Sequence, residues 1–393
     1  MAGPLAGIKI LDFTRYQQGT SATVMLAEMG AEVLKVEPPG GDPGRQLSRF
    51  EDGFSSYFEV LNRGKKSLVV DLRQSGGKEV IFRLATQVDV VAENFRPGVM
   101  ERLGVGYEVL AVLNPRLIFA SASMFGPHGP RAMHPGYDTI AQAAGGMLMA
   151  TRRPGDDLGT PLGGTADQVG GMMLAHGILG ALVHRERTGE GQKVDVSLFG
   201  SQLSLQMVAA SRTFYQRAPM LPQQSSGMVS GHMRCSDGRW ITFGHLNAPQ
   251  WADALHALEL DALVQDPRFT TREERARNMP ELRRLMAERV ATRPSAYWLQ
   301  RLVEADIPCT LIQDYEMLTQ DPQALANTYI YSYAHPRFGM LQAMGPVASF
   351  SKSGSVLQGP APLEPGQDTE AILTDAGFTP EEIERLRTSK TVS

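Results

Sequence analysis

The sequence has few of the residues that mark secreted, zinc-binding or nucleic-acid-binding proteins. Only two cysteines occur in 393 residues, Cys235 and Cys309, and they are too few and too far apart for a disulfide framework or a zinc site. The formal net charge of −4 argues against a general nucleic-acid binder. We therefore expect a cytoplasmic protein in a reducing environment, with no nucleic acid as a partner.

Long uninterrupted apolar runs are also missing. Lys9 interrupts the N-terminal stretch MAGPLAGIKILDF where a signal peptide needs a continuous apolar segment. The run from Met172 to Val183 is too short and too rich in glycine to predict a membrane span, so we expect no membrane partner. The hydrophobic content of 42% still allows a sizeable core, in two domains or in one large domain with an insertion.

The first 125 residues alternate between strand and helix patterns. Apolar runs predict strands at residues 8–13, 31–37, 66–72, 88–94 and 116–125, and helical patterns lie around residues 22–29, 78–87 and 97–105. Strand–helix–strand units of this length form parallel, right-handed crossovers. The predicted fold class is therefore α/β, with an open, doubly wound, Rossmann-like parallel sheet.

The rest of the chain predicts a second, smaller domain. Residues 1–204 would form the first part of the large domain, and the pattern becomes irregular at residues 205–224, a predicted linker. Residues 225–317 contain a hairpin signal at Asp237 and Gly238 followed by amphipathic helices, which predicts a small α+β domain. A second linker at 318–340 would lead into residues 341–393, a strand-poor part that returns to the large domain.

Ligands of open parallel sheets bind beyond the carboxyl ends of the strands. The residues that follow the predicted strands are Arg15, Tyr16, Gln17, Glu37, Arg73, Asn94, Phe95, Arg96, Ser121 and Ser123. The first of these turns, TRYQQGT, lacks the G-x-G-x-x-G pattern, so we do not expect a dinucleotide there.

Asp167 lies at the start of a long apolar segment, PLGGTADQVGGMMLAHGILGALVHRERTG. In a structural interpretation, Thr165 and Gln168 form a capping box, the helix dipole favours Asp167 in the first turn, and Gly189 ends the helix. In a functional interpretation, the surrounding glycines leave room for a ligand to approach the carboxylate, because helices otherwise avoid glycine. These glycines are Gly163, Gly164, Gly170 and Gly171.

The chain resembles the class III CoA-transferases, which include formyl-CoA:oxalate and carnitine CoA-transferases and, beside them, the α-methylacyl-CoA racemases. The matching segments occur in family order: GIKILDFTRYQQGTSATVMLAEMGAEVLKVEPPGGD, LNRGKKSLVVDLR, ENFRPGVMERLG, NPRLIFASASMFG, PGYDTIAQAAGG and HRERTGEGQKVDVS. The resemblance is strong over residues 5–200 and looser beyond. It implies an interlocked, ring-shaped homodimer that uses coenzyme A thioesters and small carboxylic acids as substrates, with no metal and no permanently bound cofactor.

The resemblance also implies the site residues. Asp167 would be the catalytic nucleophile, supported by Gln17 and Tyr137, and coenzyme A would lie across the carboxyl end of the sheet. The residues implied in binding coenzyme A are Gln17, Val70, Leu72, Arg73, Asn94, Phe95, Arg96, Arg102, Pro135, Gly136, Tyr137 and Asp138. The three arginines among them carry guanidinium groups suited to phosphate.

The chain departs from the family pattern in three places. Pro38 stands where some relatives have a basic residue, and Arg45 is a candidate to supply that phosphate contact. The glycine-rich lid of formyl-CoA transferases corresponds to QQSSGMVSGH, with only Gly227 and Gly231, which puts oxalate specificity in doubt. Asp368 replaces the usual histidine of a C-terminal motif, and no function follows from it.

The chemistry implied for Asp167 is covalent catalysis by a carboxylate. Asp167 would attack the donor thioester to form a mixed anhydride, the released thiolate would convert it to an aspartyl-CoA thioester, and the acceptor acid would reverse these steps. The start of the helix is expected to keep Asp167 ionised. Its backbone N–H groups are expected to stabilise the developing negative charge.

Two alternative functions stay open. The racemases use the same aspartate with a histidine, but this sequence has Tyr137 at that position, and tyrosine is a poor base at neutral pH. His134 lies three residues earlier and is interpreted as a surface-loop residue. The other alternative is a protein that binds CoA thioesters without turnover.

Overall fold

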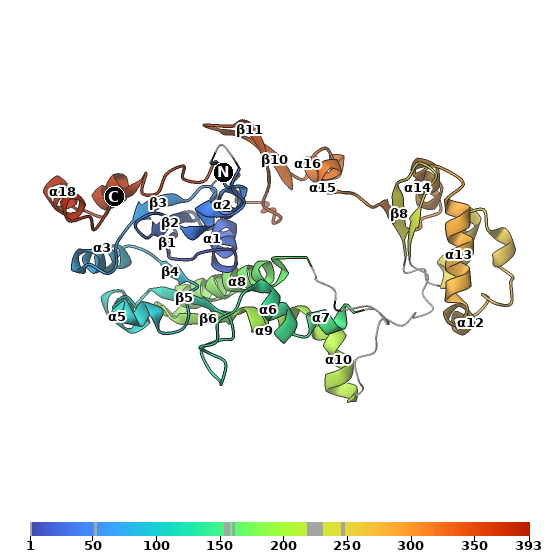
Figure 1. Cartoon of the computed structure of the whole chain (residues 1–393), viewed down its shortest axis with the longest axis horizontal. Coiled ribbons are helices and arrows are strands. Elements are labelled where there is room, and N and C mark those ends of the chain that lie inside the picture. Colours follow the sequence, from blue (N-terminus) through green and yellow to red (C-terminus); the bar gives the residue numbers. More distant parts are fainter. Residues whose placement is uncertain (1, 51–52, 153–157, 159–161, 218–230, 245–247) are drawn as a thin grey trace. The chain divides into compact units, whose positions relative to one another are not determined.

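The computed structural model describes residues 2–50, 53–152, 158, 162–217, 231–244 and 248–393. The chain divides into two compact units, drawn with their elements in Figure 1: unit 1 comprises Met1–Met220 and Gln323–Ser393, and unit 2 comprises Leu221–Pro322. Unit 1 is therefore assembled from two separate stretches of sequence.

Unit 1 contains a six-stranded sheet with the order β3-β2-β1-β4-β5-β6, and every neighbouring pair is parallel. Its strands are β1 (Lys9–Asp12), β2 (Glu32–Glu37), β3 (Lys66–Val69), β4 (Val90–Glu93), β5 (Ile118–Ser123) and β6 (Lys193–Ser197). This order is that of a Rossmann-type sheet. The α/β fold class is confirmed, and β6 is an edge strand that the apolar runs did not predict.

Helices surround this sheet, and a hairpin lies in the C-terminal part of unit 1. The helices before the boundary are α1 (Gln18–Glu28), α2 (Ser56–Asn62), α3 (Ser75–Ala85), α4 (Val99–Arg102), α5 (Tyr107–Leu113), α6 (Asp138–Ala144), α7 (Met147–Ala150), α8 (Thr165–Thr188), α9 (Leu198–Leu205) and α10 (Met207–Gln216). The later elements are α16 (Pro322–Ala326), the strands β10 (Ile330–His335) and β11 (Gly339–Met344), α17 (Thr369–Asp375) and α18 (Pro380–Thr388).

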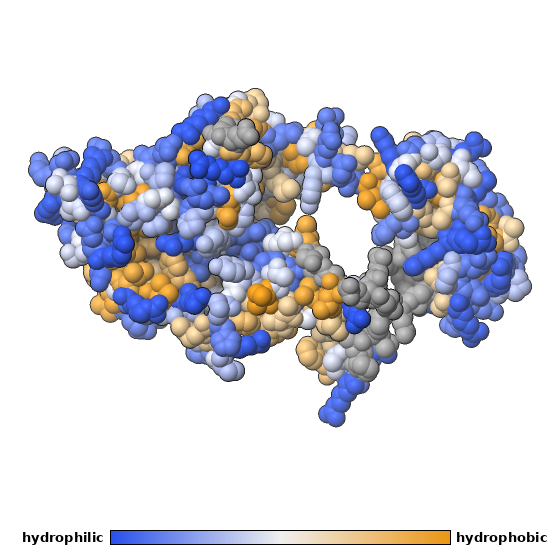
Figure 2. All heavy atoms as spheres, viewed as in Figure 1, coloured by the Kyte–Doolittle hydropathy of each residue, from blue (hydrophilic) through white to orange (hydrophobic). Residues whose placement is uncertain are grey.

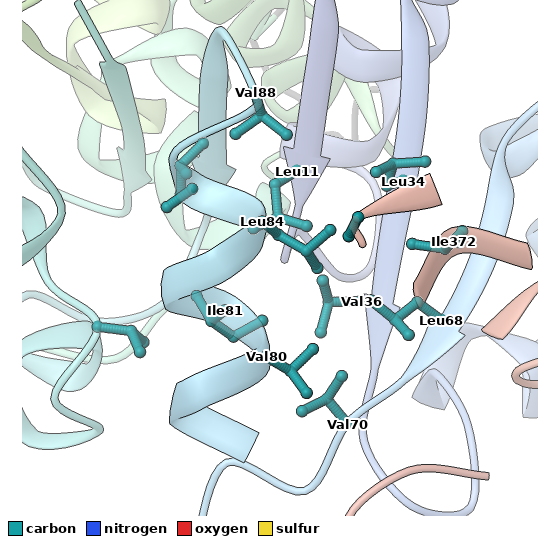
Figure 3. Close-up of a cluster of buried hydrophobic side chains, with 14 of the residues drawn as sticks. Leu11, Leu34, Val36, Leu68, Val70, Val80, Ile81, Leu84, Val88 and Ile372 are labelled. Carbon is teal, nitrogen blue, oxygen red and sulfur yellow. The ribbon is translucent and has the colours of Figure 1, made fainter. Parts of the chain in front are cut away.

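Successive residues of each strand face opposite layers, as the pleat of a strand requires. Ile10 of β1 packs in a cluster with residues of α1 and α8, whereas the adjacent Leu11 packs in a cluster with residues of α3, α5, α17 and α18. Figure 3 shows the second cluster, in which Leu84 of α3 and Ile372 of α17 lie near Leu11 and Leu34. Helices thus cover both faces of the sheet.

Helix α8 is long and apolar enough to cross a membrane by length and composition alone. It packs instead inside unit 1, where Leu174 and Ile178 are fully buried against the sheet. A side chain at Gly171 would come within 2.1 Å of the Ser21 hydroxyl, and one at Gly170 within 2.9 Å of the Gln18 amide. These two glycines therefore make room for helix α1 rather than for a ligand.

The C-terminal residues are joined to strand β3 and its following turn. Val392 forms a bridge with Val70, and the backbone N–H of Asp71 donates to the Thr391 carbonyl at 2.8 Å.

Two predictions for the second half of the chain were wrong. The predicted second linker and strand-poor region contain the β10–β11 hairpin, and helix α10 occupies part of the first predicted linker.

Unit 2 is a small α+β unit with a core of its own. Its antiparallel sheet has the order β7-β8-β9, formed by β7 (Gly231–Arg234), β8 (Trp240–Phe243) and β9 (Cys309–Leu311). The predicted hairpin is formed by β7 and β8. Its helices are α11 (Ala248–Ala257), α12 (Arg272–Arg277), α13 (Met279–Val290), α14 (Ser295–Glu304) and α15 (Tyr315–Leu318). Both cysteines are free.

Candidate active site

A buried charge network fixes the turn after β1. Asp12, at the end of β1, accepts a hydrogen bond from Lys65 at 3.0 Å, and Lys35 donates to the Thr14 carbonyl at 2.9 Å. Burial would raise the pKa of Asp12, but the charges of Lys65 and Lys35 outweigh burial and hold it below its usual value. A buried ion has lost its hydration, so each of these charges is stabilised only by its partners of opposite sign. The network therefore holds the backbone that leads into residues 15–17 in one conformation.

Asn94 clamps the same turn from the end of β4. Its side-chain oxygen accepts from the Arg15 N–H at 2.7 Å, and its side-chain nitrogen donates to the Arg15 carbonyl, also at 2.7 Å. The Arg15 guanidinium lies 5.0 Å from the centre of the Phe95 ring. Its Nε is buried and has no hydrogen-bond partner among the described residues. The described residues therefore leave this donor of Arg15 unsatisfied.

The start of helix α8 differs from the prediction. Gly164 is the N-cap, with φ of +81°, and no side chain of the helix itself caps it. The capping box of Thr165 and Gln168 is wrong, because Thr165 is already helical and its hydroxyl donates to the Leu162 carbonyl at 2.6 Å. Only a glycine adopts this backbone conformation without strain.

A carboxylate from another helix caps α8. Asp138, the first residue of α6, accepts from the N–H of Ala166 at 2.6 Å and from the N–H of Asp167 at 3.1 Å. The helix dipole was expected to keep Asp167 ionised, and these N–H groups were expected to stabilise the reacting oxygen. Neither expectation holds at the start of α8, because Asp138 already accepts from the two N–H groups and places negative charge beside Asp167.

Asp167 faces a pocket of about 200 Å³, which we call the Asp167 pocket. Burial, and then the charge of Asp138, raises the pKa of Asp167 to about 7. Its carboxylate accepts no hydrogen bond from any residue in the described part of the chain, which leaves it free to react. The lining also includes Tyr16, Gln18, Asn94, Phe95, Arg96, Pro97, Ala122, Ser123, Met124, Ala132, His134, Pro135, Gly136, Tyr137 and Leu198.

Gln17 and three tyrosines lie near this position. The Gln17 side-chain nitrogen donates to the Gly164 carbonyl at 3.4 Å, next to the first turn of α8. Tyr137 packs edge-on against Tyr16, with ring centres 6.1 Å apart. Tyr57 of α2, whose pKa is raised mainly by burial and then by the charge of Asp167, was not singled out from the sequence. No motif near Tyr57 indicated that it lies close to Asp167.

A second pocket of about 300 Å³, the Arg73 pocket, lies at the ends of β1, β2 and β3. It contains Val70, Leu72 and Arg73, and it shares Phe95 with the Asp167 pocket. Arg73 makes two hydrogen bonds to Asp71, at 2.8 and 2.9 Å. Arg15 also lines this pocket. Most of the predicted coenzyme A residues are therefore divided between these two pockets, which share Phe95.

Other predicted residues lie outside these two pockets. Gln17, Arg102 and Asp138 line neither of them. Arg45, the candidate substitute for a phosphate contact, also lines neither pocket, and its guanidinium donates to Glu37 at 2.7 and 2.8 Å and to the Pro362 carbonyl. Most of the proposed lid, Gly227 included, lies outside the described residues. His134 is exposed in a loop, as expected, and it also lines the Asp167 pocket, with its ring edge-on to Phe125.

Comparison with known proteins identifies the family. The model of CoA-transferase family III matches residues 5–369. The chain belongs to this family. An acetyl-CoA:oxalate CoA-transferase from Acetobacter aceti is 36% identical over 84% of this chain and 85% of its own length. A succinyl-CoA:glutarate CoA-transferase from Homo sapiens is 32% identical, covering 95% of this chain and 86% of its own length.

Solved structures agree with this membership. A CAIB/BAIF family protein from Brucella suis has a TM-score of 0.86 and is 28% identical, over 96% of this family III chain and 100% of its own. The resemblance found in the sequence motifs is confirmed, and the family supports a CoA-transferase that uses CoA thioesters.

Proposed function

We propose that this family III member moves coenzyme A from an acyl-CoA donor to a free carboxylic acid through an aspartyl-CoA thioester on Asp167. The observation that carries the proposal is the position of Asp167. Its carboxylate has no hydrogen-bond partner among the described residues, lines a pocket at the carboxyl end of the sheet, and lies in the first turn of α8 near Gln17.

The proposed reaction follows from a carboxylate in that position. An Asp167 oxygen attacks the thioester carbonyl, the C–S bond breaks, and coenzyme A leaves as a thiolate. The thiolate attacks the Asp167 carbonyl of the resulting anhydride and releases the donor acid. An acceptor carboxylate then attacks the aspartyl-CoA thioester, and the thiolate finally attacks the acceptor acyl group to restore Asp167. Overall, coenzyme A passes from the donor to the acceptor acid, and nothing is consumed.

The two pockets fit the two parts of such a substrate. The Asp167 pocket would hold the acyl group and thioester, and the Arg73 pocket, with Arg15 and Arg73, would hold the phosphates of coenzyme A. We propose that Arg15, rather than Arg45, makes the phosphate contact expected near Pro38. Contacts of Asn94, Arg96, Arg102 and the 135–138 loop with coenzyme A remain predictions.

The test combines mass spectrometry with one substitution. Protein mixed with acyl-CoA alone should gain the mass of coenzyme A less water, on the peptide that contains Asp167. Asp167→Asn should fold, bind the CoA thioester and lose almost all transfer, because an amide does not form the anhydride. Full activity of this variant, or a strict requirement for ATP, would contradict the proposal.

A racemase is the second candidate, because His134 lines the same pocket as Asp167. A racemase would exchange the α-proton of a 2-methylacyl-CoA with solvent deuterium. We expect no exchange above background, and rapid incorporation that is lost in His134→Gln would establish the racemase instead.

We propose a homodimer as the working assembly, interlocked as the resemblance implies, and located in the cytoplasm. Figure 2 shows apolar surface over α6 and α7 of unit 1. Helix α10 buries none of its residues, and Val208 and Tyr215 on it are 82% and 87% exposed. A helix of this kind needs a covering surface. Light scattering should give a dimer that does not dissociate on dilution, and a monomer would refute this assignment.

A further inference from the structure

The cap on helix α8 brings the carboxylate of Asp138 close to Asp167, and a stable helix start does not require two carboxylates there. A serine or asparagine at the N-cap would satisfy the first N–H groups without adding charge. Here Gly164 is the N-cap, and Asp138 reaches the N–H groups of Ala166 and Asp167 from helix α6. Asp138 is only 9% exposed, so little water screens its charge from Asp167.

Asp138 is itself held in place. Its Oδ2 accepts from the Gln142 side-chain nitrogen at 2.6 Å, one turn further along α6, while its Oδ1 accepts the two N–H groups of α8. The Gln142 side-chain oxygen is buried without a partner among the described residues. Among the described residues, the hydrogen bonds of the Asp138 carboxylate hold it at the start of α8, and none of them comes from a cation.

We propose that Asp138 is a positioning residue for Asp167. Asp138 caps the first turn of α8, and its negative charge favours the acylated over the ionised form of Asp167. The inference rests on the proposed function. Ionised Asp167 is repelled by Asp138, but the anhydride and the aspartyl-CoA thioester carry no charge on that residue. Formation of either adduct removes the repulsion, so the covalent forms gain relative to free enzyme.

The other titratable and charged groups near Asp167 do not supply this effect. Tyr16 follows β1, Tyr57 lies on α2 and Tyr137 precedes α6, and neutral phenols place no charge beside the carboxylate. Arg96 and His134 line the pocket, and positive charge on either would act in the opposite direction. The direction of the pKa shift of Asp167, upward, agrees with burial and Asp138 as the dominant influences.

The test separates the charge of Asp138 from its hydrogen bonds. Asp138→Asn keeps an oxygen for the N–H groups of Ala166 and Asp167, and Gln142 can turn its amide to accept from the new nitrogen. Asp138→Ala removes the cap as well. Asp368→Asn is the matched control, because Asp368 also accepts a backbone N–H, from Ser67 at 2.8 Å, but lies away from the pocket.

The first readout is the equilibrium between acyl-CoA with free enzyme and the aspartyl-CoA adduct at pH 8. We expect Asp138→Asn to lower the adduct-to-free ratio by about tenfold, which corresponds to one unit of pKa. Its rate of adduct formation should persist to lower pH than in the parent protein. Asp138→Ala should form adduct more slowly at every pH and unfold at lower temperature, and Asp368→Asn should match the parent.

An Asp138→Asn variant with the adduct ratio and pH profile of the parent would overturn the proposed charge effect. Histidines change charge in the same pH range, so the comparison is repeated in His134→Gln. The difference between the parent and Asp138→Asn should persist there, and its disappearance would assign the effect to His134. Turnover by Asp167→Asn would instead overturn the proposed function, whatever the Asp138 variants do.

Discussion

The side-chain nitrogen of Gln17 lies 3.4 Å from the carbonyl oxygen of Gly164, and a Cβ at residue 164 would come within 2.7 Å of that nitrogen. The first turn of helix α8 and the turn after β1 therefore meet at a position where a side chain would displace Gln17 and strain the backbone. This contact connects the stability of the site to its chemistry, and it provides the first prediction.

Gly164→Ala should abolish most transfer activity and destabilise the protein. The left-handed backbone at φ +81° costs about 1–2 kcal/mol for alanine, and the methyl group displaces Gln17. Gly146→Ala is the control, because Gly146 caps α7 at φ +87° with open space around it. Thermal unfolding should show similar losses in both variants, whereas only Gly164→Ala should lose kcat/KM. Equal activity of the two variants would show that Gln17 need not approach Gly164.

The rate of adduct formation should rise with pH and reach half its maximum near pH 7. In the proposed mechanism Asp167 reacts as the carboxylate, and burial together with Asp138 raises its pKa to about 7. Rapid-quench mass spectrometry of the parent protein with acyl-CoA between pH 5 and 9 would measure this profile. A flat profile would mean that bound substrate or another group controls the charge of Asp167.

Asp167→Asn should unfold at a higher temperature than the parent at pH 8. The pKa of Asp167 is about 7 in the folded state, above its ordinary value of 3.8. The protonated carboxyl therefore makes its full contribution to the stability of the fold below pH 3.8. It is lost as the pH rises to about 7, above which the ionised group destabilises the fold.

Asparagine removes that pH-dependent cost. We expect an increase in Tm of roughly 2 °C or more at pH 8, shrinking toward pH 4. Differential scanning calorimetry of Asp167→Asn, with Asp368→Asn alongside, would measure it. A Tm at pH 8 equal to or below that of the parent would be inconsistent with a strongly raised pKa.

Arg15→Gln should weaken the binding of coenzyme A phosphates. The buried Arg15 Nε has no partner among the described residues, so its loss removes a charged donor from the Arg73 pocket without breaking an ion pair. We expect KM for acyl-CoA to rise roughly tenfold, while KM for the matching acyl-pantetheine, which lacks the nucleotide phosphates, stays constant. Arg116→Gln, at an exposed ion pair with Glu186, is the control. A similar rise for both substrates would place Arg15 outside the phosphate site.

Two alanine substitutions in helix α8 should act in opposite directions. Gly171→Ala would place a methyl group 2.1 Å from the Ser21 hydroxyl and 2.6 Å from the Gln18 carbonyl, so we expect a loss of about 1–3 kcal/mol. Gly180→Ala meets open space, and the gain in helix propensity should stabilise the protein by up to about 1 kcal/mol. Urea unfolding of both variants would test this, and destabilisation by both would mean that α8 is covered on the Gly180 side.

The sequence was informative where a pattern is local. Apolar runs predicted β1 to β5, because buried parallel strands need apolar residues on both faces. Strand β6 was missed because its burial is only partial, and Val194 and Val196 alternate with polar residues. The first linker was predicted as irregular although α10 lies there, and that helix buries none of its residues.

The site was harder to predict, because its contacts join distant residues. Family motifs singled out Asp167 and Gln17, but nothing local indicates that Asp138 caps α8 from 28 residues earlier. The capping box failed because a positive φ at Gly164 places Thr165 inside the helix. The pairing of Arg45 with Glu37 depends on the folded chain and could not be predicted locally, and the contacts of Asn94 with the Arg15 backbone were hidden for the same reason.

The discontinuity of unit 1 has a consequence for synthesis on the ribosome. One face of its sheet is completed by α17 and α18, which are made after the whole of unit 2, and the last residues then attach to β3. At about 5–20 residues per second, synthesis from the last strand of the sheet to the C-terminus takes on the order of 10–40 s, and that face stays uncovered during this time. During this interval the nascent chain presents Leu34 and Leu68 without their final partners, so we expect chaperone association before the stop codon and aggregation of chains truncated ahead of α17.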